Sequence, residues 1–168
     1  MSKAFGNRLE PELARQHMQQ LLADEAGNLE RLEALLDQER ELLSGTDVEA
    51  LERAGNARQA RIAELLRIDD ERRSMCRMLG FPADVSGLQR LLQWCDPEHQ
   101  LQQQWAECMQ KAARCRQSNE RNGALVAARL KRVEGLLGVL TGRDRNPTVY
   151  SAQGSYAHGS VGHTLAQA

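Results

Sequence analysis

Potential metal ligands gather in the second half of the chain. Cys95, His99 and Cys108 are residue types that bind zinc, and Asp96 precedes His99 by three residues. Zinc sites usually combine two closely spaced ligand pairs, and metal sites in helical bundles use Glu-x-x-His repeats on facing helices. The sequence has neither pattern, and Pro97 interrupts the spacing between Asp96 and His99. We therefore expect no metal site and no cofactor.

The cysteines are equally poor candidates for nucleophilic catalysis. A catalytic cysteine must be accessible and activated by a neighbouring base, whereas Cys108 and Cys115 occupy helix positions that we expect to be buried. Glycine-rich phosphate-binding motifs are also absent from the sequence. The sequence therefore offers no support for an enzyme.

The amino terminus does not read as a signal peptide. Glu10 and Glu12 stand where an apolar segment would be required, and no apolar run approaches the length of a membrane span. We expect a cytoplasmic protein without membrane insertion, and its four cysteines are then expected to be reduced thiols.

The composition predicts helices that pack along leucine stripes. The 168 residues include only six aromatic residues, and good helix formers dominate from Arg8 to Gly142. Three prolines in that segment, Pro11, Pro82 and Pro97, are expected to punctuate helices. The predicted fold is all-α: an elongated antiparallel helical hairpin or bundle with coiled-coil packing, three long helices, one short helix and a flexible C-terminal tail.

Leucines at seven-residue intervals predict a first helix from about Glu10 to Leu43. A capping box formed by Thr46 and Glu49 would open a second helix. That helix is expected to bury Leu51, Ile62, Leu65 and Leu66 and to end at Gly80-Phe81-Pro82. A short helix carrying Val85, Leu88, Leu91 and Leu92 should follow, closed by Asp96-Pro97.

The last helix carries a coiled-coil seam from Leu101 to Leu140 at alternating steps of four and three residues, and Val133 and Leu136 are among its apolar positions. The middle of the seam is polar, with Asn119, Asn122 and Arg129 at positions that normally hold apolar side chains. We expect the two asparagines to face a neighbouring helix and to hydrogen-bond one another or backbone groups. Gly123, Gly135 and Gly138 would either make this helix pliable or permit close packing, and both interpretations stay open.

Extra apolar residues flank the far end of this seam. Leu125, Leu130, Leu137 and Val139 add apolar surface beyond what a bundle requires, which indicates a binding partner. The alternative is that Leu130 and Leu137 fill the bundle core.

Charge is distributed unevenly between the first and last helices. Residues 24–41 hold seven carboxylates and two arginines, whereas residues 111–132 hold seven cations and one carboxylate, Glu120. We expect the two segments to pack against each other. A nucleic-acid surface would use the same cations, Arg114, Arg116, Arg121, Lys131 and Arg132, but binders of DNA or RNA are more often basic overall.

The composition changes after residue 145. Residues 146–168 contain no Asp, Glu, Lys or Arg and are rich in Gly, Ser, Ala and Thr. We expect a helical domain over residues 1–145 and a flexible, uncharged tail over residues 146–168.

Two segments resemble one known family. The run Asn119-Glu120-Arg121-Asn122-Gly123-Ala124-Leu125-Val126 is similar to the N-x-x-N-G-x-[LI]-[IV] signature of the FlgN family of flagellar chaperones. Leu140-Thr141-Gly142, followed by Thr148-Val149-Tyr150-Ser151-Ala152-Gln153-Gly154, resembles its L-x-G and Y-x-x-x-G segments. Asn119, Asn122 and Gly123 are the family-motif residues.

This resemblance implies a cytoplasmic chaperone of the flagellar type III export system. Such a protein binds the hook–filament junction proteins FlgK and FlgL, prevents their premature assembly and delivers them to the export gate protein FlhA. Leu130, Leu137, Val139 and Leu140 are then the expected client-binding residues, and Tyr150 is the expected contact with the export gate. The rival hypothesis is a structural coiled-coil adaptor or oligomerisation protein, and formation of a homodimer stays open.

Overall fold

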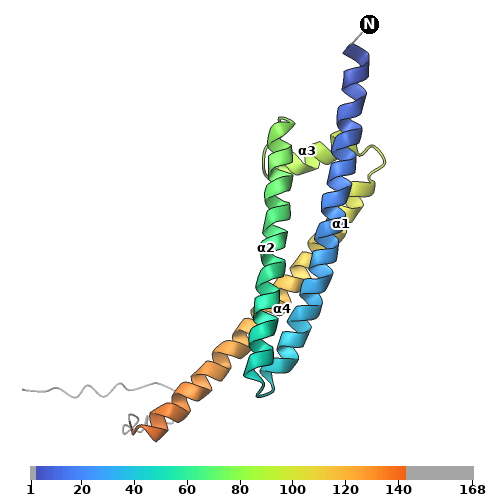
Figure 1. Ribbon diagram of the computed structural model, residues 1–168. Helices are drawn as coiled ribbons and strands as arrows, with labels where there is room; N and C mark the ends of the chain where they lie inside the picture. The colour runs from blue at the N-terminus through green and yellow to red at the C-terminus, as the bar shows by residue number, and fades with distance from the viewer. Residues whose placement is uncertain (1–2, 143–168) are drawn as a thin grey trace, which may run out of the picture. The chain divides into compact units, whose positions relative to one another are not determined.

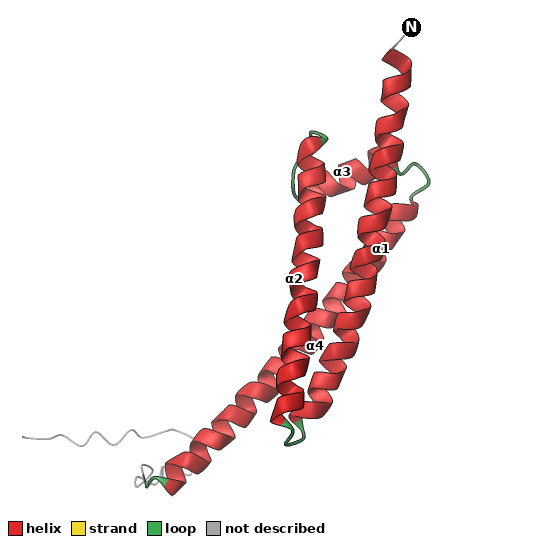
Figure 2. Ribbon diagram, in the orientation of Figure 1, coloured by secondary structure: helices red, strands yellow, loops and turns green. Residues whose placement is uncertain are grey.

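The computed structural model describes residues 3–142, with side chains placed from residue 10 onward. Four helices follow one another along the chain: α1 (Lys3–Leu43), α2 (Val48–Met78), α3 (Val85–Cys95) and α4 (Gln100–Leu140) (Figure 1). Short loops join them, and the described residues contain no strand (Figure 2). The prediction of an all-α fold is confirmed, whereas the predicted boundary at residue 145 and the tail lie outside the described residues.

The chain divides into two compact units at Val126. The first comprises residues 1–126 and the second residues 127–168. Helix α4 contributes Gln100–Val126 to the first unit and Ala127–Leu140 to the second. The packed core described below belongs to the first unit.

Helix α1 begins earlier than the sequence predicts. It starts at Lys3 rather than near Glu10, and Pro11 lies inside it. The fixed backbone φ of proline fits a helix, but a proline in the interior removes one hydrogen-bond donor and its ring crowds the carbonyl four residues earlier, so it weakens or kinks the helix without having to end it. The expectation that prolines punctuate helices is therefore wrong at Pro11.

The cap of α2 also differs from the prediction. Asp47 is the N-cap residue, and its Oδ1 accepts a hydrogen bond of 2.9 Å from the backbone N–H of Ala50. The predicted capping box placed this role on Thr46. Aspartate is as good an N-cap as threonine, and its carboxylate also interacts favourably with the positive end of the helix dipole.

Helix α2 ends as the Gly80-Phe81-Pro82 segment predicts. Gly80 has a φ of 80°, in the left-handed region. Its N–H bonds the carbonyl of Arg77 at 3.1 Å, and the N–H of Phe81 bonds that of Cys76 at 2.8 Å. This pair of bonds is a Schellman motif, which satisfies carbonyls left over at the helix end.

The buried face of α2 only partly matches the prediction. Ala54, Ile68, Met75 and Cys76 are buried apolar residues, and Leu51, Ile62 and Leu65 are partly buried. Leu66, however, is 61% exposed. Successive helix residues point about 100° apart, so Leu65 and Leu66 cannot both face the same core.

The short helix α3 is held at both ends by aspartates. Asp84 Oδ1 accepts from the N–H of Gly87 at 2.8 Å, and a side chain at Gly87 would collide with the carbonyl of Pro82. At the other end, fully buried Asp96 ends α3 and starts α4: Oδ2 accepts from Leu101 N–H at 2.7 Å. The Asp96-x-x-His99 sequence therefore forms the turn between α3 and α4, in which the Asp96 carboxylate caps a helix.

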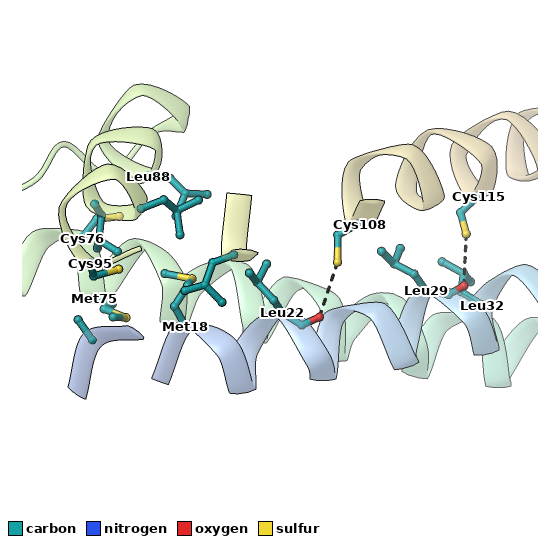
Figure 3. Packing of buried hydrophobic residues seen from close by; sticks show 14 of the residues in the cluster. Met18, Leu22, Leu29, Leu32, Met75, Cys76, Leu88, Cys95, Cys108 and Cys115 are labelled. Carbon is teal, nitrogen blue, oxygen red and sulfur yellow. Dashed lines mark hydrogen bonds between the residues drawn. The ribbon is translucent and has the colours of Figure 1, made fainter. Parts of the chain in front are cut away.

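Helices α1 and α4 run parallel in the first unit, whereas α2 runs antiparallel to both. Cys108 Sγ lies 3.6 Å from the carbonyl oxygen of Leu22, and Cys115 Sγ lies 3.5 Å from that of Leu29 (Figure 3). Both pairs have the same sequence offset of 86 residues, as parallel helices require. By contrast, the earlier residue of α2, Arg58, pairs with the later residue of α1, Glu39. The later residue, Arg72, pairs with the earlier Glu25, so α1 and α2 run in opposite directions. The predicted antiparallel bundle thus includes one parallel pair, which the α3 crossover permits.

A buried ion pair lies within this core. Arg72 donates to Glu25 Oε2 at 2.5 Å and to Asp69 Oδ1 at 2.9 Å, and its guanidinium lies 5.8 Å from the ring centroid of Trp105. Arg72 and Glu25 are 8% and 7% exposed. The two carboxylates outweigh the cost of burial and raise the pKa of Arg72 above its ordinary value. These contacts tie α1, α2 and α4 together.

Candidate functional site: an exposed apolar stripe on helix α4

The end of α4 exposes large apolar side chains in the second unit. All four predicted client-binding residues are exposed: Leu130 by 58%, Leu137 by 54%, Val139 by 71% and Leu140 by 81%. In the described structure the two leucines are therefore not core residues. An isolated exposed leucine is ordinary, but a contiguous group marks a binding surface.

Two further residues of the second unit extend this surface. Val133 and Leu136 are 46% and 59% exposed, and they were assigned to the bundle seam on sequence grounds. We call the set of six the α4 apolar stripe: Leu130, Val133, Leu136, Leu137, Val139 and Leu140. Steps of three and four residues place most of them along one face of the helix. The segment from Ala127 to Leu140 spans about 21 Å at about 1.5 Å per residue, which is enough to pair with several turns of another helix.

The end of the stripe is fixed by local hydrogen bonds. Thr141 donates from its N–H to the carbonyl of Leu137 at 2.9 Å, and its hydroxyl donates to the same carbonyl at 2.7 Å. Gly142 then adopts a φ of 66°, a left-handed conformation that glycine reaches without strain. The Leu140-Thr141-Gly142 segment therefore forms the C-terminal stop of α4.

Two cations beside the stripe form no ion pair with a carboxylate in the described part of the chain. Lys131 and Arg132 are exposed, and neither takes part in any ion pair among residues 10–142. Residues 127–142 hold three cations and one carboxylate, a formal charge of 3 − 1 = +2. The apolar stripe thus lies in a positively charged segment.

Earlier on α4 the cations do have partners. Lys111 donates to Glu30, and Arg114 Nε donates to Glu33 Oε1 at 3.0 Å. The bond from Lys111 lowers the pKa of Glu30. These two pairs confirm the predicted packing of the acidic part of α1 against α4 for the beginning of the basic segment, whereas Lys131 and Arg132 at its end form no such pair in the described chain.

The family-motif asparagines both contact neighbouring helices. Asn122 is 2% exposed, and its Nδ2 donates to the carbonyl of Leu36 on α1 at 2.8 Å. Asn119 is exposed and accepts from Arg58 on α2 through Oδ1 at 3.2 Å. The prediction that both face a neighbouring helix is confirmed. Asn122 bonds a backbone group as predicted, whereas Asn119 bonds the side chain of Arg58. Asn119 belongs to a polar layer that the sequence did not reveal, because Arg58 also lies 3.4 Å from buried Glu39.

Gly123 does not permit close helix packing in this structure. A Cβ built on Gly123 or on Gly135 would meet no atom within 4 Å. Of the two interpretations left open by the sequence, close packing is excluded at these two positions within the described chain. A weakened helix remains as the physical consequence of both glycines.

The cysteines are buried thiols. Cys76, Cys95, Cys108 and Cys115 are all free and buried, and burial raises the pKa of Cys95 and of Cys108 to about 11. A thiol that stays protonated at neutral pH is a poor nucleophile. Burial of Cys108 and Cys115 is as the seam predicts.

The described residues do not assemble a metal site. Among residues 3–142, no group of three or more His, Cys, Asp or Glu side chains is placed to hold an ion. A surface cavity of about 420 Å³ between α3 and α4 is lined by residues without titratable side chains: Val85, Gln89, Leu92, Gln93, Gln102, Trp105 and Ala106.

Among residues 3–142, none of the helices has the length and apolar character that a membrane span requires.

Tyr150, the predicted contact with the export gate, lies outside the described residues. The α4 apolar stripe is therefore the candidate site, and Asn122 belongs to the packed bundle that precedes it.

Comparison with known proteins identifies the family. The model of the FlgN protein family matches residues 14–158, which is most of the chain and includes both the α4 apolar stripe and Tyr150. Neither the curated proteins nor the solved structures that were compared gave a match. With a family match over far more than half of its length, the chain belongs to the FlgN family of flagellar export chaperones.

Proposed function

We propose that this protein binds the hook–filament junction proteins FlgK and FlgL in the cytoplasm, prevents their premature assembly and delivers them to the flagellar export gate through FlhA. The observation that carries the proposal is the α4 apolar stripe. A binding function of this kind needs an exposed apolar face and no bond chemistry, and the buried thiols are consistent with that.

The stripe suits capture of an amphipathic helix. Helix-in-groove and helix-to-helix recognition places apolar side chains at steps of three and four residues against a complementary apolar face. Leu130, Val133, Leu137 and Leu140 have this spacing and are all exposed. Covering such a side chain removes apolar area from water, which contributes about 1.5–3 kcal/mol when burial of a leucine is complete.

Co-purification of the full-length chain with FlgK and with FlgL tests the proposal. The double variant Leu130→Ser/Leu137→Ser should weaken both complexes at least about tenfold, since each substitution removes about 1 kcal/mol or more of apolar burial. Leu13 and Leu66 are each 61% exposed and lie outside the stripe. Leu13→Ser/Leu66→Ser is therefore a matched control and should bind as the wild type does.

Folding must be measured alongside binding. Circular dichroism should show the same helix content in both double variants, because none of the four leucines is buried. If wild-type chain captures neither FlgK nor FlgL, the proposed clients are wrong. If the stripe variant unfolds together with losing its clients, the leucines serve stability and the stripe is not the client site.

Delivery to the export gate is assigned to Tyr150 by its position in the family's tyrosine-glycine segment. A tyrosine offers an aromatic face and a hydroxyl at small conformational cost, as is common at binding hot spots. Tyr150→Ala should leave folding and FlgK binding unchanged and reduce binding to FlhA. A marked loss of thermal stability, or unchanged FlhA binding, would reject this role.

A further inference from the structure

We propose that the helix bound by the α4 apolar stripe carries carboxylates along one flank of its apolar face, and that Arg132 selects for them. This inference rests on the proposed function, since it names the chemistry of the client that the stripe accepts.

Arg132 lies at the edge of the stripe. It precedes Leu136 by four residues and Val139 by seven, spacings that put the three side chains on the same side of a helix. Arg132 is exposed and forms no ion pair among the described residues. A helix lying on the stripe would cover Leu136 and pass beside the guanidinium of Arg132.

Lys131 occupies a different face, although it is the next residue. It follows Ala127 by four residues and precedes Gly135 by four and Gly138 by seven, so apart from Glu134, three residues further on, its neighbours on the helix surface are small. A partner on the leucines would not contact this face. The two adjacent cations therefore have the same charge but different positions relative to the stripe.

Charge complementarity decides between the candidate occupants of the stripe. A second copy of this chain would bring another segment of formal charge +2 and a second Arg132, so like charges would face each other. The chain's own residues 146–168 contain no Asp or Glu. A nucleic acid would neutralise the cations, but its phosphates would not remove the leucines from water. An amphipathic helix with carboxylates beside its leucines satisfies both the apolar and the charged surface.

The test uses the full-length chain and two synthetic helical peptides. Both peptides carry the same leucine stripe, one with glutamates along the flank and the other with lysines at the same positions. Fluorescence anisotropy at low salt should show tighter binding of the glutamate peptide by about fivefold or more, an advantage that high salt removes.

Adjacent charge reversals provide the matched comparison. Arg132→Glu should abolish the preference for the glutamate peptide and improve binding of the lysine peptide. Lys131→Glu changes the net charge of the chain equally and should retain most of the preference. Equal effects of the two variants would show that only the overall field matters, and unchanged binding by Arg132→Glu would likewise overturn the role of Arg132.

The remaining outcomes separate this inference from the proposed function. If FlgK and FlgL bind the wild type but Arg132→Glu does not weaken them, the charge rule fails while the function stands. If neither client binds and the glutamate peptide still depends on Arg132, the function fails while the charge rule stands. Sedimentation showing a dimer that Leu130→Ser/Leu137→Ser dissociates, or random-sequence duplex DNA displacing the peptide, would overturn the assigned occupant.

Discussion

Asn122 on α4 donates a hydrogen bond to the backbone carbonyl of Leu36 on α1 at 2.8 Å. The bond has the same sequence offset of 86 residues as the contacts of Cys108 with Leu22 and of Cys115 with Leu29. Each heptad of α4 thus directs one small donor at a carbonyl on the same edge of α1. A slip of either helix by one turn would break all three contacts, so this row specifies the register of the parallel pair.

Asn122→Ala should lower the free energy of unfolding by about 1–2 kcal/mol, because it removes a buried hydrogen bond and leaves a small cavity. Asn122→Leu should stay within about 1 kcal/mol of the wild type, since apolar side chains suit seam positions. Urea unfolding measures both changes. Asn119→Ala is the control: Asn119 is exposed, and a cost equal to that of Asn122→Ala would contradict the assignment.

The sequence could predict the elements of this fold because the leucine period is local information. Leu22, Leu29 and Leu36 all lie in the buried core of α1, as their seven-residue spacing indicates. The charge pattern likewise predicted the contact between the acidic part of α1 and the beginning of the basic part of α4, where two ion pairs form. The parallel direction of that pair could not be derived, because it depends on the crossover made by α3 and on the buried cap at Asp96.

Arg72→Ala should destabilise the chain by about 3–5 kcal/mol, because it leaves buried Glu25 without its cation. Arg67 provides a matched comparison: it bonds Glu64 and Glu71 on the exposed side of α2. Arg67→Ala should cost less than about 1 kcal/mol. Denaturant unfolding of the two variants checks this, and equal losses would mean that the buried pair has no special role.

Arg72 also shows why buried charges were missed in the sequence. An arginine in an arginine-rich helix is expected on the surface, and only its three-dimensional neighbours Glu25, Asp69 and Trp105 make burial favourable. The exposure of Leu130 and Leu137 is one of two outcomes that the sequence left open, since leucines beside a seam can either extend the surface or fill the core. Val133 and Leu136 were assigned to the seam, because periodicity alone does not show whether a seam position is covered.

The buried thiols predict a loss of stability at alkaline pH. The pKa of Cys108 is raised from its ordinary value of 9.0 to about 11 by burial, so between these values the unfolded chain releases a proton that the folded chain keeps. Stability is therefore unaffected by Cys108 below about pH 9 and falls as the pH rises toward about 11. Urea unfolding at pH 8 to 10.5 should show this decline, with a shallower slope in Cys108→Ala. Identical slopes in the two proteins would contradict it.

Alanine at Gly135 should stabilise α4 by about 0.5–1 kcal/mol, because alanine has the higher helix propensity and its Cβ would meet no atom within 4 Å. Gly123→Ala should have the same effect for the same reason, and thermal unfolding followed by circular dichroism measures both.

Gly135→Ala also tests whether a pliable α4 is needed for client binding. If α4 must bend to receive FlgK, Gly135→Ala should weaken that complex while raising thermal stability. If binding is unchanged or tighter, the glycine is not needed for capture, and a more ordered stripe is the better binding surface.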